Sequence, residues 1–270
     1  MQGTLNKMTT RLGTVVDYAL PLGNERLALN RVIGATLSLR YTGRIFCVAC
    51  GRKTSRSFAQ GHCYPCMKKL AACDLCIMKP ETCHYHLGTC REPEWGESHC
   101  MIGHVVYLAN TSGLKVGITR ATQIPTRWMD QGATQALPIF RVKTRRISGL
   151  MEVALAQTMA DKTNWRALLK GDNEPIDLPE RAVEAAAAFG ETIAELNLRF
   201  GADAVQAVDA EVLEIRYPVT EYPKKINSFN FDKNATVEGT LMGIKGQYLI
   251  FDSGVINIRK FTGYEVEVQI

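Results

Sequence analysis

Residues 47–66 read CVACGRKTSRSFAQGHCYPC, and this stretch constrains the local fold more tightly than any other part of the chain. It contains two Cys-x-x-Cys pairs, Cys47 with Cys50 and Cys63 with Cys66, separated by a twelve-residue spacer. The other five of the nine cysteines follow at positions 73, 76, 83, 90 and 100, and the rest of the chain has none. Clustering of this kind indicates a local cause, either disulfide bonds or metal binding.

The redox setting favours metal binding. The N-terminus lacks the basic-then-apolar order of a signal peptide, and no run approaches the roughly 18 apolar residues of a membrane helix. We therefore predict a cytoplasmic protein with no membrane partner, whose thiols stay reduced. Two thiolate pairs on tight turns can complete the tetrahedral shell of one Zn²⁺, and the arrangement resembles a zinc ribbon. The prediction is a structural zinc site at Cys47, Cys50, Cys63 and Cys66, whose loss would unfold the module.

The remaining cysteines predict a second zinc site. Cys73 and Cys76 form a third Cys-x-x-Cys pair. We expect Cys83 and Cys90 to complete its ligand set. A site with only three protein ligands would keep a position open for water, as catalytic zinc sites do. The alternative ligands left open in this stretch are His86, His99 and Cys100.

Charge is distributed unevenly along the chain. The net charge is +5, but residues 101–150 alone carry seven bases and one acid, a net +6. Residues 171–214 carry eleven acids and two bases, a net −9. A segregated basic segment is typical of nucleic-acid-binding surfaces, so we expect DNA or RNA as a partner, and a protein partner for the acidic segment. Alternate bases of 141–146 would share one face of a strand, and the predicted phosphate contacts are Arg120, Arg141, Lys143, Arg145 and Arg146.

Both ends of the chain have strand-forming patterns. Residues 31–46 predict a hairpin about Thr42-Gly43, and residues 264–270 alternate apolar and polar side chains. A Gly-Thr-Leu triplet occurs at 3–5 and again at 239–241. We expect an α+β fold in which the terminal segments pair into a small barrel. The predicted divisions are a β-rich segment 1–46, a cysteine cluster 47–100, a central domain 101–170, an acidic helical segment 171–214 and a β-rich segment 215–270.

Two helices are expected in the second half of the chain. Ser148 is a candidate N-cap for a helix over about 149–160. Pro179 would open another helix in its first turn, running to residue 200, and Gly201 would end it.

The central domain predicts two adjacent strands, 104–110 and 114–119, then a short helix, a third strand near 138–142 and the helix after Ser148. This β-β-α-β-α order resembles the GIY-YIG nuclease domain. In that family a Gly-Ile-Tyr and a Tyr-Ile-Gly triplet lie on adjacent strands, and their counterparts here are Val-Val-Tyr at 105–107 and Lys-Val-Gly at 115–117.

The resemblance also implies an active site. Arg127 matches the family arginine, Glu152 its metal-binding glutamate, and Asn164 an asparagine of the excision-repair branch. Tyr107 would then orient or deprotonate a water, and Arg127 would hold the phosphate oxygens. Glu152 would bind one Mg²⁺ or Mn²⁺. Lys115 replaces the second family tyrosine and could clamp phosphate as a point charge.

Two functions follow. The first is a zinc-binding, nucleic-acid-binding protein that acts as a metal-dependent phosphodiester endonuclease of GIY-YIG type. The second is a non-catalytic nucleic-acid or ribonucleoprotein adaptor built on a degenerate nuclease scaffold, which Lys115 favours and Glu152 disfavours. The runs at 50–54 and 115–120 also resemble a bacterial family of zinc-containing proteins. The sequence leaves open whether the nucleic acid is DNA or RNA.

Overall fold

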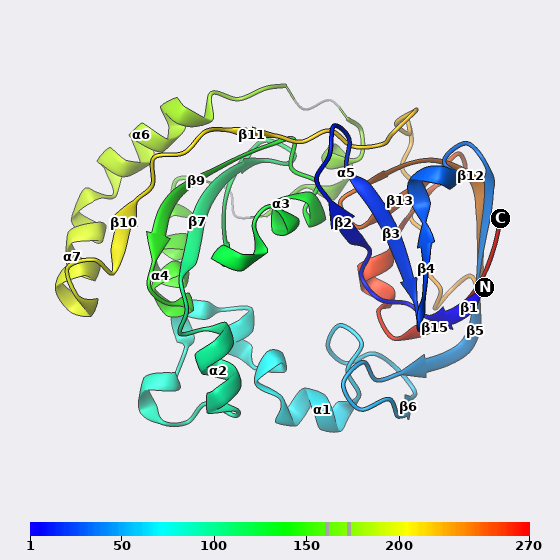
Figure 1. Ribbon diagram of the computed structural model, residues 1–270, viewed down its shortest axis with the longest axis horizontal. Helices are drawn as coiled ribbons and strands as arrows, with labels where there is room; N and C mark the ends of the chain where they lie inside the picture. The colour runs from blue at the N-terminus through cyan, green and yellow to red at the C-terminus, as the bar shows by residue number, and fades with distance from the viewer. Residues whose placement is uncertain (160–161, 172–173) are drawn as a thin grey trace.

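The two ends of the chain meet in one seven-stranded sheet in the computed structural model, which describes residues 1–159, 162–171 and 174–270 (Figure 1). Gly3 pairs with Val266, and the N-terminal ammonium donates to the Val268 carbonyl at 2.9 Å. The terminal segments therefore pair as predicted. The described strands form no closed barrel, because the edge strands β1 and β14 do not pair with each other. The strands are, in spatial order, β1 (Gln2–Thr4), β15 (Tyr264–Gln269), β5 (Thr36–Phe46), β12 (Thr236–Lys245), β13 (Tyr248–Phe251) and β14 (Val255–Asn257), with β6 (Lys53–Thr54) beside β5.

Strand β5 is continuous where the sequence predicted a hairpin. Its register against β15 shifts between Tyr264 and Val266, and Gly43 there has a φ of +82°. Gly43 thus forms a bulge in the ladder, a position that accepts the left-handed conformation. The hairpin prediction was wrong because β15, from the far end of the chain, supplies the pairing partner that neighbouring residues were expected to supply.

A three-stranded antiparallel sheet follows β1 along the chain. It consists of β2 (Thr9–Arg11), β3 (Asp17–Leu22) and β4 (Glu25–Ala28), and the 3-10 turn η1 (Leu29–Val32) leads into β5. Leu20, Leu39 and Val266 are fully buried or nearly so in one core that both terminal segments share. Residues far apart in the sequence therefore hold this part of the molecule together.

The central sheet has the order β10 (Val205–Ala207), β9 (Gln135–Val142), β7 (His104–Asn110) and β8 (Leu114–Arg120), with β11 (Leu213–Glu214) also paired to β9. The 3-10 turn η6 (Ala121–Gln123) and helix α3 (Thr126–Asp130) connect β8 to β9, and helix α4 (Arg145–Leu155) follows β9. The chain thus runs β-β-α-β-α through this region, the predicted order of elements.

Both faces of the central sheet are covered, which explains why every residue of β7 is buried. Val106 and Leu108 pack with α4 and with two helices beyond it, α6 (Leu178–Ala188) and α7 (Gly190–Phe200). Tyr107 points to the opposite face, where it joins Trp128 and Met129 in the core of the terminal sheets. Packing between the central and terminal sheets therefore buries the face that carries Tyr107.

The helix limits differ from those predicted. Thr144, not Ser148, caps α4, because its side chain accepts from the Ile147 N–H at 3.4 Å, while buried Ser148 donates back to the Arg145 carbonyl. The predicted end of that helix, Ala160, lies outside the described residues. Asp177 caps α6, and the predicted helix 179–200 is divided at Phe189 into α6 and α7. The protein partner proposed for the acidic segment 171–214 stays a prediction.

The remaining short elements connect these parts. These elements are α1 (Tyr64–Lys69), η2 (Ala71–Cys73), η3 (Leu75–Ile77), η4 (Pro80–Thr82), η5 (Tyr85–Leu87), α2 (Pro93–His99), α5 (Trp165–Leu168) and η7 (Ile258–Phe261).

No helix among the described residues combines the length and the apolar character that crossing a membrane requires.

Candidate functional site

The four cysteines of the first predicted centre come together. Cys47 follows β5, Cys50 ends the turn after it, and Cys63 and Cys66 stand at the start of α1. Their sulfur atoms all lie within 4.8 Å of one another, and Cys50 Sγ is 3.8 Å from Cys63 Sγ. A tetrahedron with metal–sulfur bonds of about 2.3 Å has sulfur–sulfur edges of about 3.8 Å. This group can hold a metal ion such as zinc.

Backbone geometry prepares Cys47 to ionise. Gly51, at φ +71°, closes the turn by donating its N–H to the Cys47 carbonyl at 2.8 Å. The Cys63 N–H points at Cys47 Sγ from 3.2 Å. Burial opposes ionisation, but hydrogen bonds from the backbone of Cys63, Cys50 and Ala49 outweigh it and lower the pKa of Cys47 to about 6. A thiolate is the form that binds metal.

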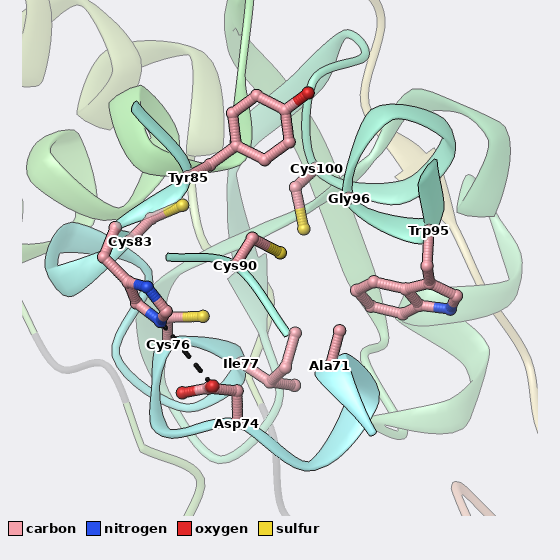
Figure 2. Close-up of a pocket in the computed structure, with 11 residues that line it drawn as sticks. Ala71, Asp74, Cys76, Ile77, Cys83, Tyr85, Cys90, Trp95, Gly96 and Cys100 are labelled. Atoms are coloured by element: carbon pink, nitrogen blue, oxygen red, sulfur yellow. Dashed lines mark ion pairs between the residues drawn. The ribbon is translucent and has the colours of Figure 1, made fainter. Parts of the chain in front are cut away.

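The other cysteines are arranged differently from the prediction. Cys76, Cys83 and Cys90 line a small cavity as expected, but the fourth cysteine at this cavity is Cys100 and not Cys73 (Figure 2). Cys73 ends η2, three residues before Cys76, and is not among the residues that line the cavity. Cys100, the C-cap of α2, is brought in from the far end of the module.

The two histidine alternatives have other partners. His86 contacts the guanidinium of Arg146, with Arg146 Nη1 3.1 Å from each ring nitrogen. The His99 ring stacks on Trp95 at a centroid separation of 4.2 Å. Neither imidazole lines the cavity.

Tyr107 and Arg127 are linked through Gln131, a residue that the sequence did not single out. The hydrogen bonds orient the Gln131 amide so that its nitrogen donates to Tyr107 Oη at 2.9 Å, while its oxygen accepts from Arg127 Nε and Nη2 at 3.1 Å. Burial raises the pKa of Tyr107, and the charge of Arg127 opposes that shift. Tyr107 is 0% exposed, so its phenol is neutral at physiological pH and out of contact with solvent.

Gly117, on β8, lies opposite Tyr107, and the tyrosine side chain explains why position 117 is a glycine. A Cβ at this position would lie 2.6 Å from Tyr107 Cζ and Oη. The Tyr107 ring also packs edge-on against Trp128 at 5.8 Å between centroids. The aromatic ring occupies the space that a side chain at Gly117 would need.

The other residues implied by the nuclease resemblance have different environments. The negative charge of Glu152, on α4, adds to the rise in the pKa of Tyr107. Lys115 is buried, and its Nζ lies 3.4 Å from Thr163 Oγ1, next to the end of the β7–β8 hairpin. Asn164 caps α5, accepting from the N–H groups of Arg166 and Ala167.

The alternate bases of 141–146 do not form one strand face. Strand β9 ends at Val142, so Arg145 and Arg146 belong to the first turn of α4. Arg145 Nη2 donates to the Ile77 carbonyl at 2.7 Å, which ties α4 to the second cysteine module. Lys143 pairs with Asp203, and of the five only Arg141 and Lys143 are exposed. The prediction of a single basic strand face was wrong because Thr144 starts a helix there.

A different set of arginines is linked by charge. Burial lowers the pKa of Arg145; Cys100 and Cys76 oppose this shift, and the charges of Arg127 and Arg120 add to it. Burial also lowers the pKa of Arg259, on η7; the charge of Arg127 adds to the shift, and that of Asp130 opposes it. We call Arg120, Arg127, Arg145 and Arg259 the arginine cluster. None of the four forms an ion pair with a carboxylate in the described part of the chain.

Sequence reasoning missed Gln131 and Arg259. Gln131 follows Arg127 by four residues, the spacing of neighbours on one helix face, and that signal was available. Arg259 lies 132 positions from Arg127 in the sequence, and no local pattern connects the two.

Comparison with known proteins gives one family. The profile described as "Protein of unknown function (DUF2797)" matches residues 34–266, a range that includes both cysteine modules and the whole central sheet. Neither the curated proteins nor the solved structures contain a match. The nuclease resemblance therefore stays a prediction. The chain belongs to the DUF2797 family.

Proposed function

We propose that this protein binds nucleic acid without cleaving it, using the arginine cluster to hold backbone phosphates. The observation that carries the proposal is that Arg127, Arg120, Arg145 and Arg259, each on a different element, are linked by charge, and that none of the four forms an ion pair among the described residues. The cysteine modules adjoin the cluster, because Arg145 hydrogen-bonds Ile77 and Arg259 hydrogen-bonds Gln60.

Phosphate is the ligand that best fits this arrangement. All four arginines are partly buried, so solvent screens their mutual repulsion less than it would at a fully exposed surface. A phosphate would remove that repulsion and accept paired hydrogen bonds from planar guanidinium groups. A chain of phosphates, as in DNA or RNA, would engage several arginines at once.

The burial of Tyr107 favours binding over cleavage. A catalytic phenol must reach the attacking water within hydrogen-bond distance. Tyr107 lies instead between the central sheet and the terminal core, 0% exposed, with its hydroxyl accepting a hydrogen bond from the Gln131 amide. Moving it to solvent would require the two sheets to separate.

A GIY-YIG endonuclease is the second candidate, and one observation favours it. The hydrogen bonds from Tyr107 through Gln131 to Arg127 connect two residues that the family resemblance assigns to catalysis. The charge of Glu152 also reaches Tyr107, and this carboxylate would hold the Mg²⁺ or Mn²⁺.

Fluorescence anisotropy with labelled single-stranded and duplex DNA and RNA tests the binding proposal. On duplex DNA, four phosphate contacts predict a slope of log affinity against log salt near −3.6, or about a hundredfold loss between roughly 50 and 200 mM salt; on single strands the slope would be about −2.8. Arg127→Gln and Arg259→Gln should each weaken binding about tenfold and make the slope shallower by about 0.9.

Arg26→Gln is the matched control, because Arg26 is an exposed arginine of β4. This substitution removes the same charge away from the arginine cluster. Affinity that is independent of salt, or equal losses in all three variants, would contradict the proposal.

A cleavage assay on the same nucleic acids, with Mg²⁺ or Mn²⁺, separates the two candidates. We expect no cutting by the wild-type protein. Metal-dependent cutting that disappears in both Glu152→Ala and Glu152→Gln, with binding retained, would instead establish the endonuclease.

A further inference from the structure

We infer that Cys76, Cys83, Cys90 and Cys100 form a second tetrathiolate site for a zinc-like divalent ion. The four cysteines line one cavity (Figure 2), and their sulfur atoms turn toward its interior from different sides. The cavity volume is about 10 Å³, roughly the space of one water-sized sphere. It therefore has room for a single ion.

The ligands come from short elements that the backbone places around the cavity. Cys76 lies in η3, Cys83 is the C-cap of η4, Cys90 follows η5 and Cys100 is the C-cap of α2. Unlike the first centre, these four sulfurs do not all lie within 4.8 Å of one another among the described groups. Binding an ion would draw the short turns inward.

This module needs a metal because it has almost no apolar core. Of residues 71–103 the buried ones are Ala71, Pro80, Cys83, Gly96 and Cys100. None carries a large hydrocarbon side chain, so burial of apolar area stabilises this module very little. Small modules of this composition are commonly held by disulfides or by a structural metal, and all nine cysteines here are free.

A cation lies beside the cysteines of this cavity. Four thiolates around a divalent ion carry a net charge of −2, and a nearby cation would stabilise it. Arg145 is such a cation, because its backbone N–H donates to the Cys100 carbonyl at 2.8 Å and its Nη2 donates to the carbonyl of Ile77, another residue that lines the cavity, at 2.7 Å. Arg145 Nε is buried and has no hydrogen-bond partner in the described ranges, so one donor of this guanidinium is left unsatisfied.

A competing set, Asp74 with Cys76 and His84, also has its ligand atoms within 4.8 Å of one another. The Asp74 carboxylate, however, already pairs with Arg91 at 2.6 Å. A cation placed between Asp74 and His84 would be repelled by that guanidinium. Four thiolates are also a softer ligand set, which zinc prefers in structural sites.

Zinc content of the purified full-length protein tests the inference. Wild type should hold two zinc ions per chain. Cys83→Ser and Cys100→Ser should each hold one, because a structural site rarely survives the loss of a ligand. Cys73→Ser is the matched control and should hold two, since Cys73 does not line the cavity. The one zinc ion retained at the first centre would show that each variant still folds around that site.

X-ray absorption at the zinc edge tests the same inference without a mutation. Two tetrathiolate sites predict an average of four sulfur ligands per zinc, at about 2.3 Å. Bound nitrogen or oxygen would point to Asp74 and His84, and loss of the second ion in Asp74→Asn or His84→Gln would agree with that outcome. One zinc in wild type, or loss of an ion in Cys73→Ser but not Cys100→Ser, would overturn the inference.

Discussion

Gly117 and Tyr107 illustrate how one residue fixes the conformation of another across two strands. The tyrosine ring lies over the glycine, its hydroxyl is held by Gln131, and Trp128 closes its edge. The side chain therefore has little room to move. The triplets 105–107 and 115–117, which in the sequence resemble a degenerate catalytic motif, therefore contain a tightly packed pair, Tyr107 and Gly117.

Replacing Gly117 by alanine should destabilise the protein by about 1–3 kcal/mol, the usual cost of overpacking a core. The new Cβ would lie 2.6 Å from the Tyr107 ring. Urea denaturation measures the change. Gly103→Ala is the control, because no atom lies within 4 Å of its added Cβ, and its effect should stay within about 0.5 kcal/mol. Equal effects in both variants would show that the Tyr107 ring is free to shift.

Lys245 is a buried cation whose titration should appear in the stability of the protein. Its ammonium lies 5.7 Å and 5.4 Å from the ring centroids of Tyr217 and Tyr222, and burial lowers its pKa to about 8. The unfolded chain keeps this proton up to a pH of about 10.5, so it binds more protons than the folded protein between the two pKa values. Stability contributed by Lys245 therefore rises with pH across that window.

The free energy of unfolding of wild type should gain about 2 kcal/mol, relative to Lys245→Met, between pH 8 and 10. Lys260→Met removes an exposed lysine and should keep the wild-type slope. Chemical denaturation at several pH values gives the three curves. Parallel curves for wild type and Lys245→Met would mean that Lys245 titrates normally.

At the scale of the element, capping residues decide where the helices of the central region begin. Ser148 fits the sequence pattern of an N-cap, yet Thr144 occupies the cap of α4 because β9 ends two residues earlier. The pattern predicted the helix correctly and its first residue wrongly. Helix α6 is more regular, since Asp177 caps it and Pro179 lies within its first turn.

Asp177→Ala should lower stability by about 1 kcal/mol, the typical cost of losing an N-cap. Asp177 Oδ1 accepts from the Glu180 N–H at 3.0 Å, and α6 and α7 cover one face of the central sheet. Thermal denaturation of Asp177→Ala beside Asp209→Ala, an exposed aspartate outside any helix or strand, measures the effect. No difference between the two would show that α6 does not depend on its cap.

At the scale of the whole molecule, a few polar contacts join the central sheet to the terminal sheets. Asp130, on α3, accepts from Lys7 Nζ at 2.7 Å and from Gln247 Nε2 at 2.9 Å. Gln247 is buried and also bonds both the N–H and the carbonyl of Met8. This junction holds α3 against the terminal core and so keeps the Tyr107 face covered.

Asp130→Ala should cost about 2–3 kcal/mol, because it leaves the buried amide of Gln247 without one of its acceptors and removes a charged partner. Lys7→Ala should cost less than about 1 kcal/mol, since the Lys7 side chain is 43% exposed. Urea denaturation ranks the two variants. A larger loss in Lys7→Ala would show that the ion pair, and not the buried amide, stabilises the junction.

Local spacing predicted the first metal centre, while the second depended on packing. Cys47 and Cys50 are brought together by a single turn, whose geometry two intervening residues determine. Cys100 reaches its cavity only because α2 folds back over the short turns before it, and Cys73, although it has the right spacing from Cys76, does not line the cavity.

The sequence by itself determined the metal-binding group at Cys47–Cys66, the β-β-α-β-α order of the central region and the strand character of both ends. These depend on side chains within a few residues of one another, where backbone geometry leaves few arrangements. The tertiary structure alone decided that the face carrying Tyr107 is covered and that the charge of Arg127 acts on Arg259. Those outcomes depend on contacts between segments more than a hundred residues apart, because burial and charge proximity are properties of packed surfaces and not of spacing along a chain.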